Sequence, residues 1–174
     1  MAEMVPVTIT GIVREHVSAT DPRERFYIRL ESAVDGDSRR LDIGVGDTEA
    51  ASLGFTLQGA LFRRPMTYQF IASLIEAAGS EVGSVRVTQM TDEIFYAQVT
   101  LRDGAVVDAR PSDAINLAAV TGAPVTVASD LFDLPTGSRA QVSRRSWPDR
   151  ENGPLPTQRG AGVPSPYCLR ATPP

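Results

Sequence analysis

The spacing of apolar residues changes along the chain, and this change most limits the folds that the chain can adopt. Three early segments of the 174 residues alternate apolar and polar positions, two later segments repeat apolar residues at helical spacing, and alternation then returns. Alternation predicts half-buried strands, because successive side chains of a strand point to opposite faces of a sheet. Helical spacing predicts amphipathic helices. The segments predicted as strands are 5–13, 25–32, 39–45, 82–90, 93–101, 105–109 and 123–129, and those predicted as helices are 46–62, 66–79 and 111–122.

The predicted elements follow one another as β-β-β-α-α-β-β-β-α-β, so strands and helices form separate clusters. Such clustering favours an α+β fold with a mixed, largely antiparallel sheet and three main helices, because a doubly wound sheet requires strands and helices to alternate. Asp103-Gly104 predicts a tight hairpin between two strands. Polar residues near the three predicted helix starts are placed to cap them: Asp47, Thr67 and Ser112.

A change in charge and composition near residue 135 predicts a domain boundary. Residues 1–135 carry eleven arginines and nineteen acidic residues, a net charge of −8, whereas residues 136–174 carry six arginines and two acidic residues, a net charge of +4. Seven of the thirteen prolines lie in 136–174, and this composition cannot bury enough apolar surface to fold alone. We expect one domain over 1–135 and a mostly disordered segment over 136–174, which is either a solvated tail or a basic arm that contacts nucleic acid.

The residues that are scarce in this chain exclude several kinds of site. His16 is the single histidine and is expected in a surface loop, so neither a Ser-His-Asp triad nor a site with several histidine ligands is expected. Cys168 is the single cysteine, which excludes a disulfide within the chain and a cysteine metal cluster. No segment resembles a secretory leader or has the apolar length of a membrane span, so we expect a cytoplasmic protein without membrane association.

The segment "DARPSDAI", residues 108–115, concentrates charged residues where a predicted strand ends and a predicted helix begins. Arg110 and the amides of a helix start attract anions, while Asp108 and Asp113 could hold a divalent cation or share a proton. A purely structural role suits the segment as well, with Ser112 as helix cap, Asp113 favoured by the helix dipole, and Asp108 paired with an arginine. The residues alone leave both interpretations open.

Two other segments place charged residues at predicted helix starts. Arg63 and Arg64 precede Pro65 and a predicted helix, where cations oppose the helix dipole. This placement indicates a carboxylate or phosphate partner, although a surface loop explains the two arginines equally well. Glu49 lies in the first turn of another predicted helix, where the dipole alone explains an acidic residue.

Four segments together resemble the bifunctional nuclease domain family in order and spacing: "LDIGVGDTEA", "RRPMTYQF", "IFYAQVTL" and "VDARPSDAINLA". The resemblance covers roughly residues 5–133, nearly all of the predicted domain. It implies an α+β domain that often self-associates and that has nuclease activity on RNA and DNA in some members. The positions that match the family motifs are Glu49, Arg64, Pro65, Thr67, Asp108, Arg110, Pro111, Ser112 and Asp113.

The resemblance also implies roles for these residues in phosphodiester hydrolysis. Such hydrolysis needs a positioned water and stabilisation of charge on the phosphoryl oxygens. The implied catalytic residues are Asp108, Asp113 and Glu49; Asp108 and Asp113 are the implied ligands of Mg²⁺ or Mn²⁺; and the implied phosphate-binding residues are Arg64, Arg110, Thr67 and Ser112.

One departure from the family pattern favours a second function. The family usually has threonine, histidine and aspartate after the proline, whereas this chain has Thr67, Tyr68 and Gln69. Loss of the imidazole and the carboxylate, together with the acidic charge of the domain, also fits a non-catalytic domain that self-associates or binds a partner protein.

Overall fold

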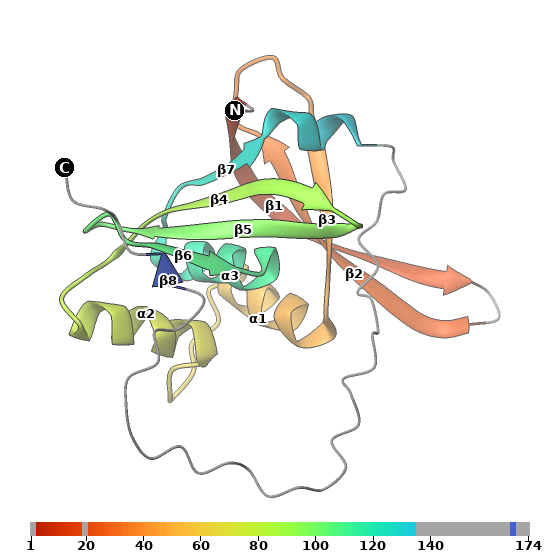
Figure 1. Cartoon of the computed structure of the whole chain (residues 1–174). Helices are drawn as coiled ribbons and strands as arrows, with labels where there is room; N and C mark the ends of the chain where they lie inside the picture. The colour runs from red at the N-terminus through yellow and green to blue at the C-terminus, as the bar shows by residue number, and fades with distance from the viewer. Residues whose placement is uncertain (1–2, 19–20, 135–167, 170–174) are drawn as a thin grey trace, which may run out of the picture.

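One sheet with helices against one of its faces makes up the described part of the chain, residues 3–18, 21–134 and 168–169 of the computed structural model (Figure 1). The strands are β1 (Met4–Ser18), β2 (Asp21–Ser32), β3 (Arg40–Val45), β4 (Val82–Thr91), β5 (Ile94–Leu101), β6 (Val106–Ala109), β7 (Val125–Ala128) and β8 (Cys168–Leu169). The helices are α1 (Asp47–Leu57), α2 (Thr67–Ala77), α3 (Pro111–Thr121) and the short 3-10 helix η1 (Ser129–Asp133).

Strand β7 joins two parts of the sheet that are far apart in sequence. The strand order is β3-β2-β1-β7-β4-β5-β6-β8, with β7 antiparallel to β1 and parallel to β4. All other neighbouring strands in this order are antiparallel. Val127 of β7 lies opposite Val5 on one side and Val87 on the other, and it is fully buried. The predicted α+β fold with a mixed, largely antiparallel sheet is confirmed.

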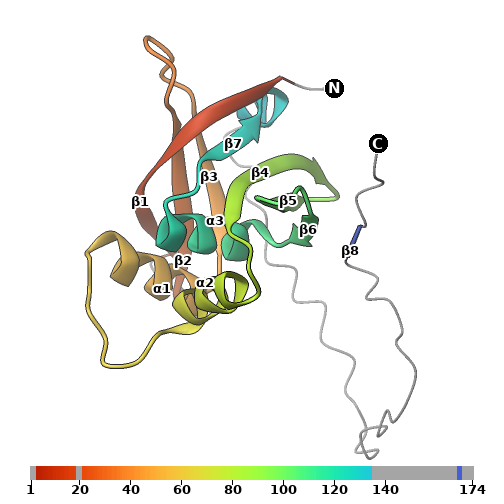
Figure 2. The same ribbon diagram turned by 90° about the vertical axis from the view of Figure 1, so that its left-hand side faces the viewer.

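Helix α3 lies at the centre of the molecule. The sheet curves around it, and α1 and α2 cover its other side (Figure 2). Ile115 is fully buried, and small residues such as Ala114 and Ala118 allow the neighbouring elements to approach closely. A helix buried on nearly all sides needs few polar residues, which explains why "AINLAAV" shows so weak an apolar stripe.

The helix starts differ from the predicted caps for a local reason. The N-cap residues are Gly46, Met66 and Arg110, all with extended backbone, rather than Asp47, Thr67 and Ser112. At α3 the cause is Pro111, because the residue before a proline avoids helical geometry and Arg110 must stay outside the helix. The predicted cap residues therefore lie inside the first turns.

Helix α1 is shorter than its apolar pattern predicts. It ends at Leu57, and Gly59 then takes a left-handed backbone with φ of 64°, which directs the chain away from the helix axis. Leu53 is fully buried, whereas Leu61, on the same predicted face, is 98% exposed. The predicted helix 46–62 therefore extends beyond the observed end of α1 at Leu57.

Three other expectations concern His16, the C-terminal segment and membrane-spanning helices. His16 is exposed as expected, but it lies in strand β1, opposite Glu24 of β2, rather than in a loop. Most of the predicted C-terminal segment 136–174 lies outside the described residues; Cys168–Leu169 pairs with β6 as strand β8. Within the described residues, no helix is long and apolar enough to cross a membrane.

The contrast between Leu53 and Leu61 predicts different costs for the same substitution. We expect Leu53→Ala to lower the free energy of unfolding by about 2 to 5 kcal/mol, because it leaves a cavity in the core. Leu61→Ala should change it by less than about 0.5 kcal/mol, because its side chain is almost fully exposed. Chemical denaturation of both variants measures the difference, and equal losses would show that Leu61 is packed.

Candidate functional site

The N-terminal ends of the three long helices meet at one cluster of side chains. Arg110 is the N-cap residue of α3 and Asp113 lies in the first turn of that helix. Glu49 lies in the first turn of α1, and Tyr68 in the first turn of α2. We call these four residues the helix-start cluster.

Arg110 connects the two carboxylates of the cluster. Its Nε donates to Oδ2 of Asp113 at 2.7 Å, and its Nη2 donates to Oδ1 at 3.0 Å. The same Nη2 donates to Oε1 of Glu49 at 3.1 Å. Both N–H groups of Nη1 remain without a partner among the described residues, and the Arg110 side chain is 67% exposed. A guanidinium has five N–H donors, so two of them are available to an anion from solvent.

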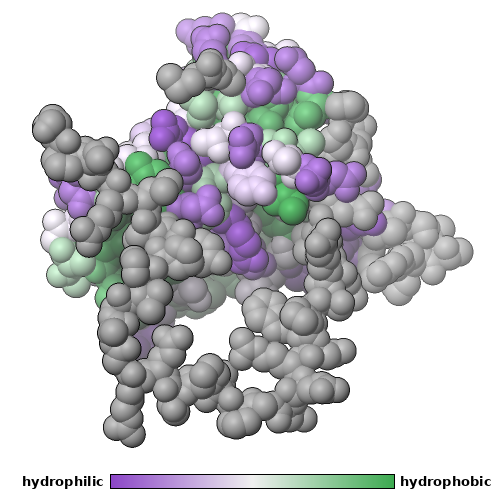
Figure 3. Space-filling model, in the orientation of Figure 1, coloured by the Kyte–Doolittle hydropathy of each residue, from purple (hydrophilic) through white to green (hydrophobic). Residues whose placement is uncertain are grey.

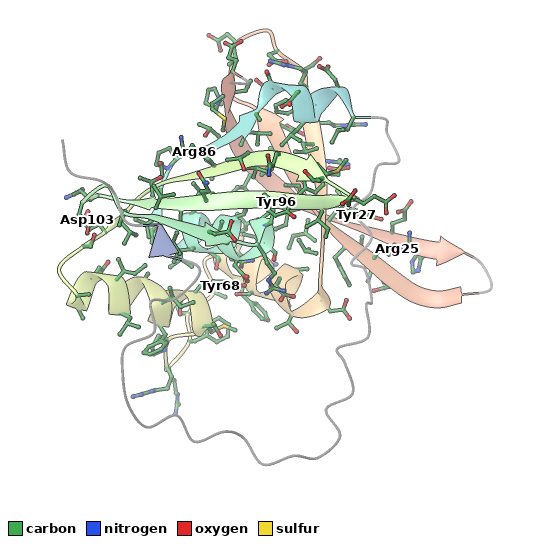
Figure 4. All side chains as sticks on the ribbon, in the orientation of Figure 1. Arg25, Tyr27, Tyr68, Arg86, Tyr96 and Asp103 are labelled. Carbon is green, nitrogen blue, oxygen red and sulfur yellow. The ribbon has the colours of Figure 1, made fainter. Side chains whose placement is uncertain are left out.

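Tyr68 is a second hydrogen-bond donor to Asp113. Its hydroxyl donates to Oδ1 of Asp113 at 2.7 Å, and its ring is buried where α2 meets α3 (Figure 4). Burial of the phenol and its hydrogen bond to Asp113 both raise the pKa of Tyr68 well above its ordinary value. Tyr68 therefore keeps its proton at neutral pH and acts as a donor.

The carboxylate of Glu49 is held over the start of its own helix. A Cβ atom built on Gly46 would lie 2.5 Å from Oε2 of Glu49, so the position of this carboxylate depends on a glycine at the N-cap. The Glu49 side chain is 20% exposed. Oε2 accepts no hydrogen bond from the described residues, in contrast to both oxygens of Asp113.

Asn116 fixes α1 to α3 directly beneath the cluster. Its Nδ2 donates to the backbone carbonyl oxygens of Glu49 at 3.1 Å and of Ser112 at 2.9 Å. The side chain is fully buried, and its Oδ1 has no partner in the described structure. The bond to Glu49 crosses from α3 to α1 and ties the backbone that carries this carboxylate to α3, whereas the bond to Ser112 stays within α3.

The charges of the cluster are balanced by backbone as well as by side chains. Two carboxylates face one guanidinium, and the positive ends of three helix dipoles offset the remaining negative charge. The hydrogen bonds that Arg110 donates to Asp113 raise the pKa of Arg110 further above its ordinary value, so the guanidinium stays charged. The cluster thus combines one guanidinium, two carboxylates and three helix N-terminal ends, and it opens to solvent at Arg110.

The structure separates Asp108 from this cluster. Val107 and Ala109 lie opposite Val99 and Ala97, both buried in the core on the helix side of the sheet. Since neighbouring residues of a strand face opposite ways, Asp108 points to the other face of the sheet, where it lies opposite Gln98. It is exposed and forms no ion pair with any described residue.

The other predicted phosphate-binding residues differ in how deeply they are buried. Ser112 is buried in the first turn of α3, and its backbone carbonyl accepts a hydrogen bond from Asn116. Thr67 is exposed beside Tyr68 at the start of α2, and Arg64 is exposed in the preceding loop. Arg64 has no ion pair within the described part of the chain. Of the predicted residues, the structure therefore brings Glu49, Arg110 and Asp113 into contact.

The carboxylates as arranged do not form a site for the expected divalent cation. Mg²⁺ and Mn²⁺ prefer several oxygen ligands around one point, but both oxygens of Asp113 accept hydrogen bonds from Arg110. In the described residues, no group of three or more His, Cys, Asp or Glu side chains could hold a metal ion. The expected Mg²⁺ or Mn²⁺ stays a prediction, and no chemical step below depends on it.

Sequence reasoning missed the roles of Tyr68 and Asn116. Tyr68 was noted only as a departure from the family pattern, because its partner Asp113 lies 45 positions further along the chain. Asn116 had a signal: it is a single amide inside an otherwise apolar helix. A buried amide in such a place needs partners from another element, and here α1 supplies one.

Comparison with known proteins gives consistent matches. A family model described as bifunctional nuclease domain matches residues 30–136, which include the whole helix-start cluster. An uncharacterised protein of Mycobacterium tuberculosis is 34% identical over 124 residues, 71% of this chain and 71% of the relative. Bifunctional nuclease 1 of Arabidopsis thaliana is 30% identical over 118 residues, 64% of this chain and 35% of that protein. Bifunctional nuclease 2 of Oryza sativa subsp. japonica is 28% identical over 122 residues, 67% of this chain and 37% of that protein.

The raised pKa of Tyr68 predicts how stability depends on alkaline pH. The unfolded phenol ionises near pH 10 whereas the folded one keeps its proton, so this contribution is complete below about pH 10 and is lost as pH rises further. Tyr68→Phe should lower the free energy of unfolding at neutral pH by about 1 to 2 kcal/mol through the lost bond to Asp113. It should also flatten the decline above about pH 10. Denaturant titrations at a series of pH values measure both effects; an unchanged decline in the variant would contradict the assignment.

Proposed function

The chain belongs to the bifunctional nuclease domain family, and from this premise we propose that it hydrolyses phosphodiester bonds of RNA or DNA at the helix-start cluster. The observation that carries the proposal is Nη1 of Arg110, which has no partner among the described residues and lies at the meeting point of three helix N-terminal ends. Helix N-termini attract phosphate through their amides and dipoles. Each of the two N–H groups of Nη1 can donate to a phosphate oxygen.

The proposed reaction is attack of water on phosphorus. A bond forms between the water oxygen and phosphorus, and the ester bond on the opposite side of phosphorus breaks. The water gives a proton to a carboxylate of the cluster, and the departing oxygen takes a proton from solvent. Arg110 stabilises the negative charge that grows on the non-bridging oxygens.

Glu49 suits the role of general base better than Asp113. Its Oε2 accepts no hydrogen bond from the described residues, so this oxygen can accept the proton of a water molecule. Asp113 is engaged at both oxygens by Arg110 and Tyr68. We assign Asp113 to positioning: it holds the guanidinium in one orientation, and Tyr68 holds Asp113.

Arg64 and Thr67 are proposed to extend phosphate binding along the nucleic acid. Both are exposed, and both lie at or before the start of α2, the helix whose first turn carries Tyr68. Polyanion binding depends on the neutralisation of phosphates, which few residues of the acidic domain can supply. Arg64→Ala should therefore weaken binding without abolishing cleavage.

A second candidate function is a non-catalytic binding domain of the same family. Its support is the closed set of bonds among Arg110, Asp113 and Tyr68, which a structural ion network also requires. In that case the cluster holds the three helices together. Substitutions in the cluster then reduce the free energy of unfolding, and the wild-type protein cleaves neither RNA nor DNA.

Two substitutions test the catalytic proposal. Glu49→Gln should lower the rate of RNA or DNA cleavage by about 10²-fold or more, because it removes the general base, whereas the matched variant Glu93→Gln in the exposed β4–β5 turn should leave it unchanged. Gly46→Ala should lower the rate by about tenfold or more, because its Cβ displaces the Glu49 carboxylate. Fluorescent oligonucleotide cleavage with Mg²⁺, Mn²⁺ or EDTA measures all three and shows whether a metal is needed.

Asp108→Asn locates the reaction on one face of the sheet. Cleavage that survives this variant but is lost in Glu49→Gln supports the helix-start cluster. Loss in Asp108→Asn alone moves the reaction to the opposite face, and equal residual cleavage in every variant indicates a contaminating nuclease and rejects the proposal.

A further inference from the structure

A proton acceptor and an anion donor of the helix-start cluster lie next to each other. Oε2 of Glu49 accepts no hydrogen bond from the described residues, and Nη1 of Arg110 donates to none of them. The two side chains are in contact, because Nη2 of Arg110 donates to Oε1 of Glu49 at 3.1 Å. A substrate that offers a hydroxyl group directly beside a phosphate therefore fits this pair.

Gly46 leaves space beside Oε2 of Glu49. A Cβ atom at residue 46 would lie only 2.5 Å from this oxygen, so a residue other than glycine would fill the position next to it. The Glu49 side chain is 20% exposed and the Arg110 side chain is 67% exposed, so the pair is open to solvent. A hydroxyl group of a substrate can therefore approach Oε2 at hydrogen-bond distance.

RNA carries a nucleophile of its own beside each phosphorus, whereas DNA does not. The 2′-hydroxyl lies next to the 3′-phosphate of the same nucleotide, so its base and its phosphate donor must be neighbours, as Glu49 and Arg110 are. Attack within one molecule avoids the entropy cost of positioning a water. DNA lacks this route, and its hydrolysis needs an activated water, which enzymes commonly generate with a metal ion.

The carboxylates of the cluster suit proton transfer better than metal binding. Both oxygens of Asp113 accept hydrogen bonds from Arg110, and Tyr68 donates to the same carboxylate. Within the cluster, Glu49 alone keeps an oxygen that accepts no hydrogen bond from the described residues. A divalent cation needs several oxygen ligands around one point, whereas a general base needs one accessible oxygen.

Exposed aromatic side chains lie beside the cluster. Six of the nine large apolar side chains that are exposed in the described residues belong to α1, α2 and the loop between them, and Figure 3 shows green side chains gathered along α2. Among the six, Phe55 and Phe62 contact each other edge to face, with ring centroids 5.3 Å apart. Both rings line one small pocket with Tyr68 of the cluster. Unpaired bases of single-stranded RNA stack on such rings.

Two arginines follow these aromatic residues in the same loop. Arg63 and Arg64 come directly after Phe62, and both are exposed. Neither forms an ion pair within the described part of the chain. Alternating aromatic and basic side chains are typical of surfaces that bind single-stranded nucleic acid, because they bind bases and phosphates in turn.

We propose that the substrate is single-stranded RNA and that the helix-start cluster cleaves it through the RNA's own 2′-hydroxyl, without a metal ion. The inference rests on the proposed nuclease function and narrows its substrate to RNA. A bond forms between the 2′ oxygen and phosphorus, and the bond from phosphorus to the 5′ oxygen of the next nucleotide breaks. The 2′ proton passes to Oε2 of Glu49, and the 5′ oxygen takes a proton from solvent. Nη1 of Arg110 stabilises the charge on the non-bridging oxygens.

The products of this step are a 2′,3′-cyclic phosphate and a 5′-hydroxyl. Glu49 returns its proton to solvent. Water then attacks phosphorus, as in the proposed hydrolysis, and opens the cyclic phosphate. Hydrolysis is therefore the second of two steps at the same residues.

Chimeric oligonucleotides test the proposal. Each is DNA except at one position, which carries a ribonucleotide, a 2′-O-methyl ribonucleotide or a deoxyribonucleotide. In EDTA, the wild-type protein should cleave only the first, on the 3′ side of the ribonucleotide, because the other two have no 2′-hydroxyl. Mass spectrometry should find a fragment lighter by one water than the linear phosphate. Glu49→Gln should slow this cleavage by about 10²-fold or more, and Glu93→Gln should not.

Binding of the uncleavable 2′-O-methyl strand tests the aromatic surface separately. Phe62→Ala should weaken binding by about tenfold, as expected for the loss of one stacked base. The matched control is Val34→Ala, which changes an exposed apolar residue outside α1, α2 and their loop and should leave the affinity unchanged. Equal affinities of Phe62→Ala and wild type overturn the assignment of this surface to RNA.

The cleavage results separate the inference from the proposed function. If the deoxyribonucleotide or 2′-O-methyl substrate is cleaved as fast as the first, the inference is overturned and the nuclease function stands. The same holds if the first substrate is cleaved only with Mg²⁺ or Mn²⁺. Cleavage of no substrate under any of these conditions overturns both.

Discussion

The contact between Arg110 and Asp113 both stabilises the start of α3 and positions the side chains of the helix-start cluster. Pro111 keeps Arg110 outside the helix, so its side chain lies at the start of α3 and reaches both carboxylates. One guanidinium thereby neutralises charges from two helices, and Tyr68 adds the third helix through the same aspartate. Without this cation, two acids would face each other at the centre of the helix layer, close to the buried Asn116.

Much of the fold follows from the sequence, because strand and helix periodicities are local. The element order and the hairpin at Asp103-Gly104 required only neighbouring residues. The strand order did not, since β7 pairs with β1 and β4 through contacts far apart in the chain. The sequence also did not predict the exposure of Phe70 and Leu74 on α2, because a periodic apolar stripe does not reveal how much of its width the core covers.

The candidate site was predictable in part. Glu49, Arg110 and Asp113 were singled out, and they are in contact. Asp108 was grouped with them because it is near in sequence, yet the alternation of β6 directs it to the other face of the sheet. The residues that replace the expected histidine and aspartate both have partners in the structure: Tyr68 donates to Asp113 of α3, and the Gln69 side chain accepts the backbone N–H of Met66 at the start of α2. The departure from the family pattern is therefore accommodated within the fold.

The position of β7 has a consequence for how the chain assembles as it is synthesised. Strands β1 and β4 are complete long before residues 125–128 leave the ribosome, yet each needs β7 as a neighbour. Until then both present open edges, which can pair with other chains. The two halves of the sheet are joined last, through contacts of long sequence separation, and such closure is slow compared with hairpin formation. Nascent chains that stall before β7 are therefore the species most exposed to aggregation.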